Sequence, residues 1–411
     1  LFVNNKSSGV FIERERLNES FLRRNKIMPV NLYKGEASRN SEKKIGLSVN
    51  LDENPGLWEK ISILNTVNLS DHRDLENFTN NIREAGSSNE KLKNLLKYGN
   101  DKILARTAIL EILLNQEIND NTHNRRLTID VWSGKKYIIP HDFSYNRNKI
   151  NNENFNLEIC STRLFCVLNQ SSDFIGLKYD LLYSVIKKEK IFEGIIKHLE
   201  DIRSKYLISQ KTDLGLIFRK DVLVRNSYGI ENEESFNQLI MSLKEREKNI
   251  LEILEKDVKT YWKKNPKGFE VTVDKSLPVS NILIEFDKEK PEWIILDYNN
   301  NKIIDENDIH FFSDENKNFQ LNLELFANRI LISKEKLFNR GALVTGNTSF
   351  LFFVEKNLTP TYLTTFNKFT GKKISIKNDE YNSNYPALHN KIIIKTAKGP
   401  KVLSGNIFLE E

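Results

Sequence analysis

The segment at 101–118, DKILARTAILEILLNQEI, is the feature that most constrains how this chain folds. Its apolar residues cover nearly the whole circumference of a helix, so the helix has no face for solvent and other elements must surround it. A chain of 411 residues also exceeds the usual size of one hydrophobic core. We therefore expect two or three domains, with this helix buried inside one of them.

The residues after this helix follow a recognisable order. The polar loop NDNTHN (119–124) ends the helix, and RRLTIDVW then alternates as a strand does. SGKK supplies a turn, YIIP is the return strand, and HDF (141–143) stands at its exit. A buried helix, a polar loop, a hairpin and an Asp-Phe pair recur in this order in the C-terminal lobes of kinases.

Three side chains in this stretch have the chemistry of phosphoryl transfer. The reaction needs a divalent metal held by oxygen ligands and a carboxylate that orients or deprotonates the attacking hydroxyl. We predict Asp120 as the catalytic carboxylate, and Asn124 and Asp142 as ligands of Mg²⁺ or, alternatively, Mn²⁺. A hairpin that folds back on itself would bring Asp142 beside Asn124. Asn and Asp are also common turn residues, so the prediction depends on the whole ordered set.

The first 255 or so residues resemble the CotH family, the atypical kinases similar to spore coat protein H. The similar segments are VNNKSSGVFIERERLNESFLRRN at 3–25, LYKGE at 32–36, the loop at 119–124, IPHDFS at 139–144 and LKEREKNIL at 243–251. The matching residues are Gly9, Phe11, Arg14, Glu15, Arg16, Lys34, Asp120, Asn124, Asp142 and Arg246.

The resemblance implies a two-lobed, ATP- and Mg²⁺-dependent protein kinase that phosphorylates serine or threonine hydroxyls of surface or coat proteins. Its cofactor-binding residues would be Glu15, Lys34 and His123. Glu15 and Lys34 would form the ion pair that holds the nucleotide phosphates in kinases. Alternating charge such as ERER is also typical of a solvated strand edge. His123 would contact the active-site loop or a phosphate.

Departures from the family keep two alternatives open. His141 stands where the family has tryptophan, and Ser144 replaces the family's second acidic residue. The family's segment before the hairpin is absent, so the kinase-like domain is truncated in its N-terminal part. One alternative is therefore a pseudokinase that acts as a non-catalytic surface-binding module. The other is a hydrolase with zinc or iron bound by His123, His141 and the nearby aspartates, although their spacing fits no zinc signature.

The character of the sequence changes near 265. Before it, we expect a hairpin at 1–17, a short helix at SFLRRN, a strand at VNLYKGE, a loop at 38–56, and helices at 75–84, from 89, and through much of 155–260. After it, VTV, NILIEF, EWIILDY, SFLFFVE and KIIIKT are short β-rich runs between turn residues. The sequence thus predicts an α+β protein with a kinase-like domain at 1–260 and an all-β, sandwich-like accessory domain at 265–411.

Two weaker motifs have ordinary interpretations. DYNNNKIIDEND (297–308) places oxygen side chains as a calcium loop does, but Lys302 occupies the position of the required glycine. We therefore expect an Asn-rich hairpin turn. Trp132, Tyr137 and Phe143 could form an aromatic platform for nucleic acid, but their places in a hairpin favour packing in a core.

The overall charge and the cysteines limit the partners. The charge of +6 is the small difference between 62 basic and 56 acidic side chains, which argues against a dedicated nucleic-acid-binding protein. No stretch approaches the roughly 20 apolar residues of a membrane helix. Cys160 and Cys166 would lie about 9 Å apart along a helix, too far for a disulfide.

The cellular compartment stays open from the sequence; the resemblance implies a bacterial surface or spore coat. The chain begins with Leu1 instead of Met, so we expect a fragment whose signal peptide or anchor would lie outside it.

Overall fold

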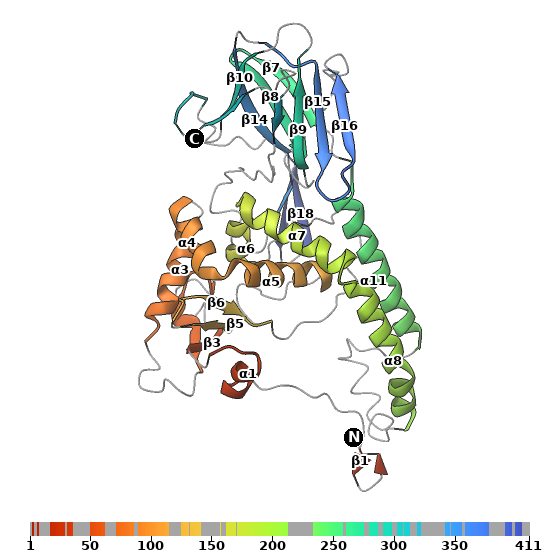
Figure 1. The fold of residues 1–411 in the computed structure, drawn as a ribbon. Coiled ribbons are helices and arrows are strands. Elements are labelled where there is room, and N and C mark those ends of the chain that lie inside the picture. Colours follow the sequence, from red (N-terminus) through yellow and green to blue (C-terminus); the bar gives the residue numbers. More distant parts are fainter. Residues whose placement is uncertain are drawn as a thin grey trace.

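The computed structural model describes residues 2–3, 6–7, 17–28, 31–35, 50–61, 71–85, 89–114, 125–130, 132–140, 157, 162–169, 171–212, 233–257, 260–274, 279–286, 291–297, 302–306, 308–312, 319–321, 342–345, 347–355, 358–377, 391–396 and 399–404. Within these ranges, every helix ends by Leu254 and every element from Thr260 onward is a strand (Figure 1). The helices and antiparallel sheets confirm the expected α+β class. None of the described helices is long and apolar enough to cross a membrane.

The helical elements are α1 (Glu19–Arg24), η1 (Pro55–Leu57), α3 (Arg73–Ala85), α4 (Asn89–Gly99), α5 (Asp101–Leu114), α6 (Arg163–Leu168), α7 (Ser172–Lys187), α8 (Ile191–Thr212) and α11 (Glu233–Leu254). The strands are β1 (Phe2–Val3), β2 (Lys6–Ser7), β3 (Asn31–Gly35), β4 (Trp58–Lys60), β5 (Arg125–Ile129), β6 (Lys136–Ile138), β7 (Thr260–Asn265), β8 (Gly268–Asp274), β9 (Val279–Glu285), β10 (Trp293–Leu296), β11 (Ile309–Phe312), β12 (Phe319–Leu321), β13 (Ala342–Thr345), β14 (Asn347–Val354), β15 (Tyr362–Asn367), β16 (Lys373–Lys377), β17 (Lys391–Thr396) and β18 (Gly399–Ser404).

α5 is surrounded by other elements, as its apolar circumference predicts. Leu104 and Ala108 belong to a core shared with α3, α4, α6 and a β-sheet. Ile109 and Leu113 belong to a second core shared with α7, α8 and α11. α5 therefore connects two cores, and the chain continues from its end into the segment 115–124.

A four-stranded antiparallel sheet in the order β4-β3-β5-β6 lies beneath α5 in Figure 1. Tyr33 and Leu127 are paired on the face that packs against the helices. On the other face, Leu32 packs with Leu22 of α1 and with Ile139. Because both faces are covered, every residue of β5 is buried.

The β-rich part contains two antiparallel sheets that share one apolar core. Their strand orders are β11-β10-β14-β8-β7 and β12-β9-β15-β16. Phe269 and Phe352 come from the first sheet and stack with ring centroids 5.2 Å apart, whereas Ile284 and Leu363 come from the second. Gly268 has a φ of 154°, and a Cβ there would lie 2.0 Å from the Phe352 carbonyl oxygen, so only glycine fits. β13, β17 and β18 form a further sheet.

The turn between β15 and β16 connects the β-rich part to the helices (Figure 1). The side-chain amide of Asn367 donates to the carbonyls of Leu254 and Lys256, 2.9 Å from each, at the C-terminal end of α11. The Phe369 ring stacks on Tyr183 of α7, with centroids 4.3 Å apart. The two parts of the chain are therefore in direct, specific contact through this turn.

The β10–β11 connection is a hairpin, as expected for 297–308. Asp297 accepts a hydrogen bond from the backbone N–H of Lys302 at 2.8 Å, and Asp308 accepts one from the N–H of Asp305 at 3.0 Å. These two carboxylates therefore stabilise the backbone of their own turn.

The expectation that Trp132 packs in a core was wrong. Trp132 is 81% exposed because it lies in the turn between β5 and β6, and its indole N–H donates to Met28 Sδ. Tyr137 is half-buried, and Phe143 lies outside the described residues. The N-terminal hairpin also turns earlier than expected, since the Phe2–Val3 strand pairs with Lys6–Ser7.

The expectation about the cysteines was also wrong. Cys166 is disulfide-bonded, and the sequence contains only one other cysteine, Cys160. The estimated separation assumed that both cysteines lie in one helix. α6 begins only at Arg163, because the Thr162 side chain caps it by accepting the N–H of Phe165. The helix therefore starts between the two cysteines in sequence.

Candidate active site

Lys34 is the predicted site residue that falls in the described part of the chain. It lies on β3, paired in register with Arg126 of β5 on one side and Glu59 of β4 on the other. Residues directly opposite each other in antiparallel strands project from the same face, so these three side chains are neighbours. Lys34 is partly exposed, whereas Arg126 is buried and donates from Nη1 to the carbonyl of Arg125 at 2.9 Å.

The other predicted site residues lie outside the described residues. They are Glu15, Asp120, His123, Asn124 and Asp142. The structure does, however, place the segments directly next to them in the chain, and those segments show which part of the fold they adjoin.

The β5–β6 hairpin brings the chain before it and the chain after it to the same end of the sheet, opposite its turn. The N–H of Ile139 donates to the carbonyl of Arg126 at 2.9 Å, just beyond the last paired residues of the hairpin. Asn124 comes directly before β5, and Asp142 comes soon after Ile139. The chain segments toward both residues thus leave the hairpin at the end where Lys34 lies.

The residue Leu17, two positions after Glu15, lies near the same end of the sheet. Leu17 packs against the cluster of Leu22, Leu32 and Ile139. Because Ile139 stands at the exit of the hairpin, the chain just after Glu15 adjoins the chain just before Asp142. The described framework therefore brings Lys34 and residues close in sequence to Asn124, Asp142 and Glu15 to one end of strands β3 and β5.

A buried ion pair holds the start of β5. Arg125 Nη1 donates to Asp52 Oδ1 at 2.5 Å, and both side chains are almost completely inaccessible. The other oxygen of Asp52 accepts the N–H of Leu164 at the start of α6, at 3.1 Å. The Arg125 guanidinium also lies over the Trp58 ring. The residue directly after Asn124 is therefore anchored to α6.

Two further buried cations hold backbone near the candidate site. Arg163 pairs with Glu53 at 2.7 Å and donates to the carbonyl of Arg83 at 2.6 Å. Lys178 of α7 donates from Nζ to the carbonyl of Leu157 at 3.1 Å and to Asn169 Oδ1 at 2.8 Å. Leu157 lies between Asp142 and α6 in the sequence, so Lys178 holds the backbone of Leu157 against α7.

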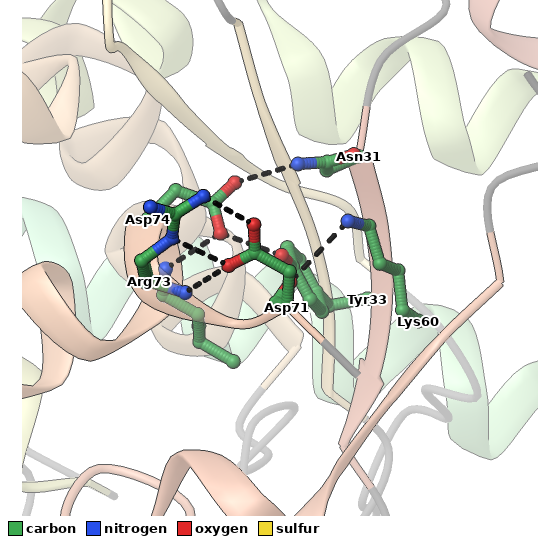
Figure 2. A network of polar contacts seen from close by, with 7 residues as sticks. Asn31, Tyr33, Lys60, Asp71, Arg73 and Asp74 are labelled. Carbon is green, nitrogen blue, oxygen red and sulfur yellow. Dashed lines mark hydrogen bonds and ion pairs between the residues drawn. The ribbon is translucent and has the colours of Figure 1, made fainter. Parts of the chain in front are cut away.

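On the opposite face of the sheet from Lys34, a polar network joins β3 to the start of α3 (Figure 2). The Tyr33 hydroxyl donates to Asp74 Oδ1 at 2.6 Å, and Asn31 Nδ2 donates to Asp74 Oδ2 at 2.9 Å. Burial, and next the hydrogen bond to Asp74, raise the pKa of Tyr33 far above its usual range. Tyr33 therefore remains a proton donor, and the network holds α3 in place.

Charged side chains surround this network. Hydrogen bonds from Arg73 hold the pKa of the Asp71 carboxyl well below its usual range. Lys60 Nζ donates to the Asp71 carbonyl at 3.3 Å (Figure 2). Nearby, burial lowers the pKa of Lys136, whose ammonium lies over the rings of Phe78 and Tyr98. Lys60 thus links the turn before α3 to the sheet, and Lys136 links the sheet to α3 and α4.

The described residues contain no group of three or more His, Cys, Asp or Glu side chains suited to a metal ion. The donors predicted for the metal, an amide oxygen from Asn124 and a carboxylate from Asp142, are the hard oxygen ligands that Mg²⁺ and Mn²⁺ prefer. In donor chemistry, therefore, the predicted set fits the cation. When bound, such a cation would neutralise charge on nucleotide phosphates.

The buried anchors of this region were missed in the sequence. Lys178 stands in the apolar run SDFIGLKYDLLYSVIK, and Arg125 opens a buried strand. A charge inside an apolar pattern is a usable signal, but long basic side chains on such helices commonly extend to solvent instead. The sequence therefore could not identify their partners.

The described residues contain a buried helix, α5, followed along the chain by the β5–β6 hairpin, in the order expected from the sequence. In agreement, a family model described as CotH kinase protein matches residues 1–213, just over half of the chain. The chain belongs to this family, and the resemblance noted in the sequence is confirmed. The family indicates a kinase-like function. A comparison with curated proteins found no match. α11 and the β-rich part lie beyond the matched residues.

Proposed function

We propose that the chain is an ATP- and Mg²⁺-dependent protein kinase that phosphorylates serine or threonine hydroxyls, with Mn²⁺ as a possible substitute metal. One observation supports this most. Lys34 and residues close in sequence to Asn124, Asp142 and Glu15 lie at one end of strands β3 and β5, inside the segment that matches the kinase family. Phosphoryl transfer depends mainly on positioning and charge neutralisation, which such a framework can supply.

In this proposal each residue has one task. Asn124 and Asp142 would hold the metal, and Asp120 would orient or deprotonate the attacking hydroxyl. Lys34 would hold nucleotide phosphates, Glu15 would pair with Lys34, and His123 would contact the active-site loop or a phosphate. The partly exposed ammonium of Lys34 supports a phosphate site, because a lysine can bind a phosphate as a point charge.

The same proposal extends to architecture and place. We propose a two-lobed kinase-like domain at 1–260 and a sandwich-like accessory domain at 265–411; the apolar core shared by the two β-sheets supports the second of these. The disulfide at Cys166 supports a place at the bacterial surface, in the spore coat or in another oxidising compartment, because disulfides persist there. The substrates would then be coat or surface proteins.

The test separates metal binding from transfer. Asp142→Ala should abolish Mg²⁺-dependent ATP binding in calorimetry, because a metal ligand is lost. Asp120→Ala should keep nucleotide binding yet lower transfer from labelled ATP by roughly a hundredfold or more, as expected for a general base. Asp130→Ala, in the exposed turn of the same hairpin, is the control and should change neither. Absence of nucleotide binding by the unmutated chain with either metal would sink the proposal.

A non-catalytic role is the second candidate, and Ser144 favours it. This position carries an acidic residue in the family, so a metal ligand is missing here. In that case the chain would be a pseudokinase whose β-rich part binds a surface. Ser144→Asp would then restore or strengthen metal-dependent ATP binding, whereas an active kinase would gain little from it.

A further inference from the structure

α11 lies beyond the residues that match the kinase family, yet it packs on the helix that leads to the candidate site. The match ends at 213, whereas α11 spans Glu233–Leu254. Leu243 and Ile250 of α11 share a core with Ile112 and Leu113 of α5. α11 therefore belongs to the same packed unit as α5.

Arg246 of α11 donates two hydrogen bonds to a single carbonyl at the end of α5. Its Nε and Nη2 atoms lie 2.8 and 2.6 Å from the carbonyl oxygen of Ile112, and the residue is 4% exposed. The last four carbonyls of an α-helix have no partner within the helix, and α5 ends at Leu114. A guanidinium at this point supplies the missing donors and complements the negative end of the helix dipole.

In the sequence, the segment 115–124 connects α5 to β5, and a buried arginine holds each of these two elements where the segment joins it. Arg246 holds the end of the helix before it, and Arg125, paired with Asp52, holds the start of the strand after it. Asp120 lies between these anchors in sequence. Fixing both ends of a connecting segment restricts the conformations available to it. In catalysis, a displacement of about 1 Å can lower the rate roughly a hundredfold.

We propose that Arg246 is a positioning residue. By holding Ile112, it sets where the chain carrying Asp120 leaves α5, so the segment after the family match completes the catalytic unit. The proposal rests on the kinase function proposed above, whereas the hydrogen bonds between Arg246 and Ile112 are present in the structure whatever the function is.

The experiment compares Arg246→Met and Arg246→Lys with Lys244→Met in the full chain. Lys244 is an exposed lysine on the same helix and serves as the matched control. Hydrogen–deuterium exchange of peptides covering 113–124 reports the anchor without any need for activity. Steady-state turnover of labelled ATP with Mg²⁺ reports kcat and KM, and thermal unfolding reports whether each variant is folded.

The positioning role predicts a distinct set of results. In Arg246→Met, exchange within 113–124 rises roughly tenfold or more over the control. kcat falls by roughly a hundredfold while KM for ATP stays within about twofold, because nucleotide contacts are retained. Arg246→Lys recovers part of kcat, since an ammonium can donate one hydrogen bond to the same carbonyl.

Three results would overturn the proposal. One is a folded Arg246→Met with unchanged exchange in 113–124, and another is a rise in KM without a fall in kcat. If Arg246→Met does not fold, Arg246→Lys decides: kcat and exchange equal to those of the unmutated chain would leave only a stabilising role. Loss of turnover in the unmutated chain would refute the kinase function instead, and the exchange result would still decide whether Arg246 anchors the segment.

Discussion

The part of the chain before 255 and the part after 260 bury different kinds of side chain. Among the described residues, every buried lysine and arginine lies in the first part, where Arg125, Lys178 and Arg246 contact a carboxylate or backbone carbonyls. The shared core of the second part is built from aromatic and aliphatic side chains such as Phe269 and Phe352.

This difference shows what each part is organised to do. Burying a charge is costly and often adds less stability than an apolar residue of the same size. Charges are therefore retained where they fix the ends of particular backbone segments. In this protein several of those segments are next in sequence to candidate site residues. The shared core of the β-rich part is apolar, and the buried carboxylates of that part, Asp297 and Asp308, bind the backbone of their own turn. The predictions below test that contrast.

The largest effect is expected for Asp52→Ala in the first part. The change leaves Arg125 buried without its carboxylate and also removes the acceptor for the N–H of Leu164. We expect the free energy of unfolding to fall by about 5 kcal/mol, the upper end for breaking a buried pair. Urea unfolding measures it. Glu270→Ala, which removes a surface partner of Lys263 in the second part, should cost about 1 kcal/mol or less. Similar losses for both would remove the contrast.

A comparable apolar test in the second part is Phe352→Ala. The ring is fully buried and stacked on Phe269, so its removal leaves a cavity. The expected loss is about 4 kcal/mol. Phe312→Ala is the matched control, because that ring is largely exposed and should change stability by less than about 0.5 kcal/mol. A loss below about 1 kcal/mol for Phe352→Ala would contradict the apolar-core account.

Asn367→Ala tests whether the two parts unfold together. Its amide caps α11 from the β15–β16 turn, and its side-chain oxygen accepts the N–H groups of Phe369 and Thr370. The loss should be about 2 to 3 kcal/mol, since several buried partners lose a hydrogen bond. Hydrogen exchange followed separately in α5 and β14 should then show two transitions where the unmutated chain shows one. Lys373→Ala, at an exposed position of β16, is the control.

Removing the disulfide should lower the stability of the first part by a smaller amount. A bond between Cys166 and the other cysteine, Cys160, closes a short loop, so its loss should cost about 2 kcal/mol. The double variant Cys160→Ser/Cys166→Ser and the chemically reduced chain should lose the same amount in thermal unfolding. Unequal losses would mean that the serine substitutions themselves perturb the fold.

The smallest effect concerns pH and Lys136. Burial lowers the pKa of its ammonium below the ordinary 10.5, with Asp74 opposing the shift. The unfolded chain then binds the proton more tightly, so stability rises with pH between the lowered pKa and about 10.5. Unfolding at about pH 8 and about pH 9.5 should show this rise, and Lys136→Met should reduce it. The raised pKa of Tyr33 acts in the opposite direction only as pH approaches and exceeds its ordinary value of 10. An unchanged pH slope in Lys136→Met would refute the assignment.

Part of the fold follows from local patterns in the chain. The apolar circumference of 101–118 predicts a helix surrounded by other elements, and α5 (Asp101–Leu114) indeed connects two cores. The alternation in RRLTI and the turn residues after it predict the β5–β6 hairpin. The family resemblance, drawn from short segments, is confirmed over 1–213. Of the candidate site residues, the structure places Lys34 beside Arg126; the roles of Asp120, Asn124, Asp142, Glu15 and His123 stay predictions.

The sequence by itself determined the secondary structure and family because both depend on residues close together in the chain. Only the tertiary structure decided which charges are buried and what they hold. Arg246 and Ile112 are separated by 134 positions, and Arg125 and Asp52 by 73, so no local pattern links them. The exposure of Trp132 and the disulfide at Cys166 depend on where a turn falls and where α6 begins, which the sequence patterns did not locate. Such contacts depend on how distant segments pack, and packing is a property of the whole fold.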